Sequence, residues 1–113
     1  MNLGKITIIE GCTENGECLN DLYGLMRMLQ SIVQACGLTV LNVSYHQFQP
    51  QGITILYLLS ESHLSIHTWP EHQRFALDMY SCRDDYCVES VLTAIKEALP
   101  IRSLQHNVIS RDV

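Results

Sequence analysis

Apolar side chains recur along this chain with two different periods, and the changes between them predict an alternation of strands and helices. Between positions 22 and 36 they recur at three- and four-residue steps, which predicts an amphipathic helix ending at Gly37. A second helical stripe runs from Val88 to Leu99, with Asp84 or Asp85 as its expected cap and Pro100 as its stop. Both stripes should face a core.

The remaining apolar segments have the length and composition of strands. The first should end at Glu10-Gly11-Cys12, and the second should turn at positions 49–52. Short links between three consecutive strands imply an antiparallel sheet. We expect a single domain, residues 1–113, folded as a two-layer α/β (α+β) sandwich with both helices on one face of the sheet, whose other face needs a partner or stays partly open. The expected strands are Lys5–Ile9, Leu38–Phe48, Ile53–Leu59, His63–Trp69, Arg74–Tyr80 and Ile101–Ile109.

Size and charge narrow the classes of function. A chain of 113 residues is too short for separate cofactor and substrate domains, so an active site would be compact or shared between subunits. The formal net charge of −5 disfavours nucleic acid and anionic membranes, and favours a cationic small molecule as partner. No apolar run approaches the roughly 18 residues of a membrane span, and the first residues lead into a strand rather than a signal peptide. We therefore expect a cytoplasmic protein.

The cysteines suggest neither a disulfide framework nor a zinc site. Five are present, an odd number without paired CxxC spacing, so at least one thiol should be free. No metal site is expected.

One segment carries an unusual density of reactive groups. Between Leu59 and Glu71, a strand-like run contains Glu61-Ser62, His67 and a further carboxylate, residues that weaken an apolar strand unless they are used. A serine after an acidic residue can attack its own preceding carbonyl, and a base can then eliminate the resulting ester to leave a pyruvoyl group. That reaction needs a hydroxyl, a base and an oxyanion donor, which Ser62, His67 and a hydroxyl such as that of Thr54 would supply.

The sequence from Glu61 to Glu71 (ESHLSIHTWPE), with Phe48-x-Pro50-x-Gly52 upstream and Ser81-Cys82 downstream, resembles the prokaryotic S-adenosylmethionine decarboxylases. The resemblance implies self-cleavage between Glu61 and Ser62, giving a β chain of residues 1–61 and an α chain of residues 62–113. The α chain would begin with a pyruvoyl cofactor made from Ser62, which binds the substrate amine as an imine and accepts electrons as carbon dioxide leaves. The product would serve spermidine and other polyamine synthesis.

The resemblance also assigns roles to single residues. His67 matches the processing base, and Thr54 matches a serine that assists processing. Cys82 matches the residue that returns a proton to the substrate α-carbon. Glu71 matches the carboxylate that binds the ribose diol, and Phe48 matches an aromatic that stacks on adenine. It further implies a homodimer of αβ units with active sites near the interface.

The chain departs from the family pattern in places that concern the substrate. Lys5-Ile6 replaces a usual Arg-His pair, Arg83 replaces a glycine, and positions 72–74 are atypical. A pyruvoyl-dependent arginine or ornithine decarboxylase therefore stays open as an alternative, as does a regulatory partner subunit that is never cleaved. One geometric difficulty remains, because Ser62 and His67 are an odd number of residues apart and should point to opposite faces of a strand. We expect Ser62 to lie in the preceding turn.

Overall fold

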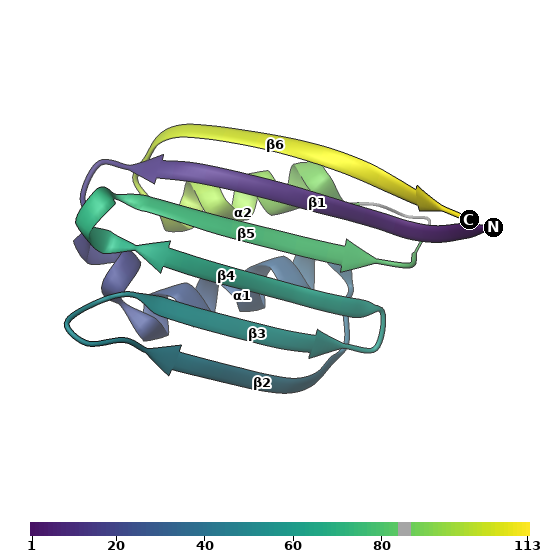
Figure 1. Ribbon diagram of the computed structural model, residues 1–113, viewed down its shortest axis with the longest axis horizontal. Helices are drawn as coiled ribbons and strands as arrows, with labels where there is room; N and C mark the ends of the chain where they lie inside the picture. The colour runs from purple at the N-terminus through teal and green to yellow at the C-terminus, as the bar shows by residue number, and fades with distance from the viewer. Residues whose placement is uncertain (84–86) are drawn as a thin grey trace.

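Antiparallel strands form one layer and two helices form the other in the part of the chain that the structure describes, residues 1–83 and 87–113 (Figure 1). This computed structural model has the strand order β2-β3-β4-β5-β1-β6, with antiparallel pairing throughout. The predicted α+β sandwich is confirmed. The strands are β1 (Asn2–Thr13), β2 (Val40–Gln47), β3 (Ile53–Leu59), β4 (Ser62–Trp69), β5 (Arg74–Ser81) and β6 (Ile101–Asp112).

Both helices lie on the same face of the sheet, where Figure 1 shows them behind the strands. Helix α1 (Leu22–Cys36) begins after Asp21, whose carboxylate accepts the Gly24 N–H at 3.1 Å, and ends at Gly37 with φ of 63°. Helix α2 (Val88–Ala98) begins after Cys87, and the predicted caps at positions 84 and 85 lie outside the described residues. Two short 3-10 helices, η1 (Glu17–Asn20) and η2 (Pro70–His72), complete the fold.

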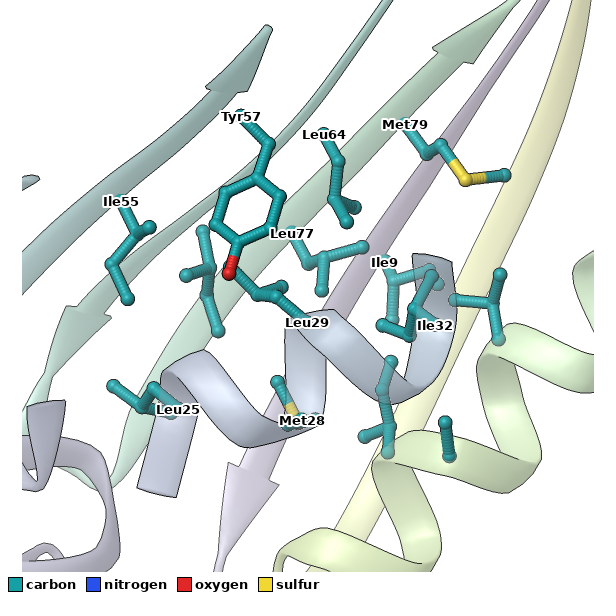
Figure 2. Close-up of a cluster of buried hydrophobic side chains, with 14 of the residues drawn as sticks. Ile9, Leu25, Met28, Leu29, Ile32, Ile55, Tyr57, Leu64, Leu77 and Met79 are labelled. Atoms are coloured by element: carbon teal, nitrogen blue, oxygen red, sulfur yellow. The ribbon is translucent and has the colours of Figure 1, made fainter. Parts of the chain in front are cut away.

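The core fills the space between the helices and one face of the sheet (Figure 2). Leu25, Leu29 and Ile32 of α1 are fully buried against strand residues such as Ile55 and Leu64. Each such side chain contributes roughly 1.5–3 kcal/mol of burial free energy. Because side chains alternate along a strand, the helices cover the odd positions of β3 and β5 and the even positions of β4.

The uncovered side of the sheet, here called the open face, carries the complementary positions. From β3 these are Thr54, Leu56 and Leu58, and the last two are 48% and 55% exposed. The odd positions of β4, from His63 to Trp69, lie on the same side. The open face is therefore a mixture of apolar and chemically reactive side chains without a covering layer.

Strand β1 is much longer than predicted. The expected stop at Glu10-Gly11-Cys12 is wrong, because these residues pair with β5 on one side and with β6 on the other. Gly11 is needed there for space rather than for a turn: a Cβ atom would lie 2.3 Å from the Phe75 ring. A glycine that looked like a turn signal in the sequence makes room for a core aromatic.

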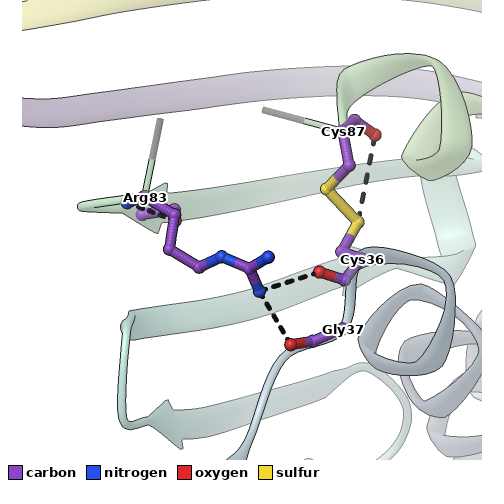
Figure 3. The surroundings of a disulfide bond; sticks show 5 residues. Cys36, Gly37, Arg83 and Cys87 are labelled. Atoms are coloured by element: carbon purple, nitrogen blue, oxygen red, sulfur yellow. Dashed lines mark hydrogen bonds between the residues drawn. A yellow bond between two sulfur atoms is a disulfide. The ribbon is translucent and has the colours of Figure 1, made fainter. Parts of the chain in front are cut away.

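The cysteine spacing suggested no disulfide framework, but the structure contains one disulfide bond. Cys36 and Cys87 are bonded, with Cα atoms 5.7 Å apart, and join the end of α1 to the start of α2 (Figure 3). Spacing could not reveal this pair because 51 positions separate the two residues. Cys12, Cys18 and Cys82 have free thiols, so the expected free thiol is present.

No helix within the described residues is long and apolar enough to cross a membrane.

Candidate functional site

The Glu61–Ser62 peptide bond lies where β3 turns into β4. Ser62 is not in the turn as predicted; it is the first residue of β4 and pairs with Ser81. Its φ of 154° lies on the positive side, which residues other than glycine rarely adopt and which costs about 1–3 kcal/mol. The bond expected to break is therefore attached to a strained residue.

The neighbouring residue, Glu61, is held at both its backbone and its side chain. Its carbonyl oxygen accepts the Cys82 N–H at 3.3 Å. Its carboxylate accepts the Thr39 N–H at 3.1 Å, and this bond holds the pKa of the Glu61 carboxyl below its usual range. The donor on the carbonyl is placed where negative charge develops if Ser62 attacks that carbon. Sequence reasoning missed this donor because it belongs to the backbone.

Cys82 itself lies immediately past the end of β5. Its side chain is exposed, and its sulfur lies 3.9 Å from the Leu3 carbonyl oxygen. The pairing of Ser62 with Ser81 places Cys82 next to the Glu61–Ser62 bond. The structure thus gathers Glu61, Ser62 and Cys82 at one end of the sheet, called the cleavage end below.

The remaining predicted residues lie further along the sheet. Thr54 and His67 face each other across β3 and β4, with the Thr54 hydroxyl 3.0 Å from His67 Nδ1. Glu71 lies in η2, beyond the far end of β4, and is exposed. Phe48 follows β2 and is 47% exposed, with its ring edge-on to the His46 ring at 4.6 Å between centroids. Glu71 and Phe48 mark what is called the binding end of the sheet.

The residues at the cleavage end and the predicted base His67 do not meet within one chain. His67 lies five residues beyond Ser62 on β4, which at about 3.3 Å per residue is roughly 17 Å along the strand. No bulge intervenes in the described register of β4, so the two positions also have opposite facing. A single chain therefore does not place the predicted base against the predicted nucleophile.

A polar cluster that sequence reasoning did not single out lies between the two ends on the open face. The Asp78 carboxylate accepts a hydrogen bond from the Ser65 hydroxyl and lies 3.3 Å from His63 Nε2. The His63 ring also packs edge-on against Tyr80. The sequence contained one signal for this cluster: Asp78 is a charged residue in a strand, β5, whose alternate residues are apolar.

Among the described residues, hollows of about 430 and 440 Å³ lie on the open face, and neither of these is lined by Ser62 or Cys82. The first, near the binding end, is lined among others by Glu10, Trp69 and Arg74. Within the described residues, no group of three or more histidine, cysteine, aspartate or glutamate side chains is placed to hold a metal ion.

Comparison with known proteins gives a consistent assignment. The profile of the S-adenosylmethionine decarboxylase family matches residues 5–112. A protein named S-adenosylmethionine decarboxylase proenzyme from Methanococcus maripaludis strain C5 is 40% identical over 98% of this chain and 91% of its own length. A protein of the same name from Prochlorococcus marinus strain MIT 9211 is 36% identical over 97% and 90%. The crystal structure of the Aquifex aeolicus adenosylmethionine decarboxylase superposes with a TM-score of 0.87 at 29% identity, covering 99% of this chain and 92% of that one. The chain belongs to the S-adenosylmethionine decarboxylase family.

Proposed function

We propose that this protein is a carboxy-lyase precursor that cleaves itself between Glu61 and Ser62 and then decarboxylates S-adenosylmethionine. The observation that carries the cleavage step is the backbone N–H of Cys82 on the Glu61 carbonyl, beside a serine with strained backbone. The names of the relatives support both the substrate and the precursor form.

Cleavage follows from these groups in three balanced steps. The Ser62 hydroxyl oxygen bonds to the Glu61 carbonyl carbon, and the C–N bond breaks to give an ester and a free amine, with the Cys82 N–H stabilising the oxyanion. A base removes the Ser62 α-proton, and the Cβ–O bond breaks, which releases Glu61 as a new terminal carboxylate. The dehydroalanine that remains takes up water and loses ammonia, which leaves a pyruvoyl group at the start of residues 62–113.

Ser62 is a suitable origin for such a group. It is partly buried, and it begins β4, so the new terminus stays anchored in the sheet by the rest of the strand. The pyruvoyl group would supply the electron acceptor that decarboxylation requires. The thiol of Cys82, beside it and exposed, would return the proton to the substrate α-carbon.

We further propose that two copies complete each active site. A two-fold axis through the open face would bring the cleavage end of one copy over the binding end of the other. His67 and Thr54 of one copy would then lie near the cleavage end of its partner, which removes the separation of about 17 Å found within one chain. Exposed Leu56, Leu58 and Trp69 give the open face apolar area to bury in such a homodimer.

The binding end fits the nucleoside part of S-adenosylmethionine. Exposed Glu71 offers a carboxylate to the two ribose hydroxyls, and the half-exposed Phe48 ring offers a stacking surface for adenine. Arginine and ornithine have no group that needs either contact. The product, an aminopropyl donor, would enter spermidine synthesis.

Mass spectrometry of the purified protein after reduction tests cleavage, because the Cys36–Cys87 disulfide would otherwise keep the two chains together. Wild-type protein should split into residues 1–61 and a pyruvoyl-blocked 62–113, whereas Ser62→Ala should stay intact. Cys82→Ala should still be cleaved, because the N–H on the Glu61 carbonyl is a backbone group, but should turn over substrate far more slowly. A wild-type chain that never splits would refute self-cleavage and favour the alternative of a regulatory partner subunit.

Carbon dioxide release from S-adenosylmethionine, ornithine and arginine, measured side by side, tests the substrate. Activity on S-adenosylmethionine that falls in Glu71→Gln through a higher KM is the expected result. Release from a free amino acid alone would refute the assignment.

A further inference from the structure

The proposed cleavage would make the Cys36–Cys87 disulfide a bond between two separate chains. The Glu61–Ser62 bond lies between Cys36 and Cys87 in the sequence, so cleavage leaves one sulfur in residues 1–61 and the other in residues 62–113. The two chains of the processed enzyme would therefore be joined covalently. This inference rests on the proposed self-cleavage.

Arg83 makes a second link between the same two chains. Its guanidinium donates to the Cys36 carbonyl at 3.1 Å and to the Gly37 carbonyl at 2.7 Å (Figure 3). Carbonyls at the end of a helix have no partner within the helix, and a cation there is favoured by the helix dipole. The link depends on the Arg83 side chain, whose guanidinium makes both contacts.

Both links lie close in the chain to Cys82, the residue whose backbone contacts the proposed cleavage site. Before cleavage, Cys82 is fixed on one side by its N–H on the Glu61 carbonyl. Cleavage turns Glu61 into a free chain end, and that hydrogen bond no longer joins Cys82 to a continuous chain. Two contacts described by the structure still connect this part of the chain to the end of α1. One is made by the guanidinium of Arg83, the residue after Cys82, and the other is the disulfide of Cys87, five residues after Cys82.

We propose that the Cys36–Cys87 disulfide and Arg83, together the interchain clamp, hold Cys82 in position in the processed enzyme, so that a dithiol lowers turnover without affecting self-cleavage. The redox step is a simple exchange: the dithiol closes to its own disulfide, and Cys36 and Cys87 each gain a hydrogen. Cys36, Cys87 and Arg83 are positioning residues, because none of them would touch substrate.

Thiol counting tests the disulfide independently of the proposed cleavage. In the uncleaved Ser62→Ala protein, an alkylating reagent under denaturing conditions should label three cysteines before reduction and five after it. In the cleaved wild type, one mass containing both chains should separate into two only after reduction. Five labelled cysteines before reduction would overturn the clamp, whereas a failure to cleave would overturn the proposed function and leave the thiol count interpretable.

Kinetics test the positioning role. Dithiothreitol, or the double change Cys36→Ser with Cys87→Ser, should lower kcat about tenfold, since small displacements of a catalytic group have effects of this size. KM should change less than about twofold, because the proposed nucleoside contacts come from Phe48 and Glu71, which the clamp does not touch. The double variant should no longer respond to dithiothreitol, which excludes reaction of the reagent with the pyruvoyl ketone.

Variants of Arg83 and Cys18 distinguish a loss of Cys82 positioning from a general loss of structure. Arg83→Gly should lower kcat, and Arg83→Lys should recover part of the loss because a cation at the helix end is kept. Cys18→Ser removes a free thiol away from the clamp and should leave kcat and its response to reductant unchanged. An unchanged kcat in the reduced wild type would overturn the proposal.

Discussion

Mixed dimers of two inactive variants give a direct test of the shared site. A chain carrying Ser62→Ala cannot form the pyruvoyl group, and a chain carrying His67→Ala lacks the proposed base. If each site takes Ser62 and Cys82 from one copy and His67 and Thr54 from the other, a mixed dimer contains one site with both changes and one site with neither. The unchanged site should cleave and turn over normally.

The expected activity follows from the symmetry of the assembly. Equal amounts of the two chains that associate at random give mixed dimers in about half of the population, each with one working site out of two, so activity should reach about one quarter of the wild-type value. If Ser62 and His67 of the same chain had to cooperate, every site in the mixture would lack one of them. The roughly 17 Å between these residues along β4 is the reason to expect the first result.

Co-expression of the two chains with different affinity tags allows the mixed dimers to be purified in sequence and assayed for carbon dioxide release. Mass spectrometry adds a second readout, because only the His67→Ala chain can be cleaved, by the His67 of its partner. Mixed dimers that are uncleaved and no more active than either parent would refute the shared site. A mixture of Ser62→Ala with Ser62→Ala under the other tag is the matched control.

Three smaller changes test other parts of the structure. Thr54→Val, which loses the hydroxyl 3.0 Å from His67 Nδ1, should slow cleavage about tenfold to a hundredfold while Thr54→Ser keeps the wild-type rate; equal rates for both variants in a time course of mass spectra would show that the hydroxyl is not used. Gly11→Ala should lower the free energy of unfolding in urea by about 1–3 kcal/mol because its Cβ would meet the Phe75 ring, and Phe75→Leu in the same chain should return part of it; an unchanged urea midpoint would argue against the register of β1. Burial raises the pKa of Tyr57, so the stability it contributes is complete below its unfolded pKa of about 10 and is lost as pH rises through the folded pKa; Tyr57→Phe should make urea midpoints less sensitive to pH in that range, and an identical slope would contradict the burial argument.

The helices and the central strands were predictable because their signals are local. The apolar steps from Leu22 to Cys36 and the αL glycine after them define α1 without knowledge of the rest of the fold. Ile53–Leu59 was predicted with the bounds that the structure has. The extension of β1 through Gly11 was not predictable in this way, because it depends on the Phe75 ring, which comes from a strand more than sixty residues later.

The types of the candidate residues were predictable, but their arrangement was not. Spacing gave no reason to join Cys36 to Cys87, since two helices have to pack side by side before the sulfurs meet. The proposed oxyanion donor is the backbone N–H of Cys82, a group that every residue except proline has, so no residue type marks it. Both depend on tertiary structure.

The arrangement also explains why one short motif contains residues that do not meet in a single chain. Glu61 precedes β4 and Glu71 follows it, so the eleven positions between and including them extend over the full length of the strand. A substrate the size of a nucleoside cannot touch both ends of a strand of about 25 Å. In a two-fold dimer with the open faces together, each copy of the motif instead contributes its first residues to one site and its last residues to the other. The motif is then short in sequence because it spans a single strand, β4, whose two ends belong to different sites. The mixed-dimer experiment decides whether this is so.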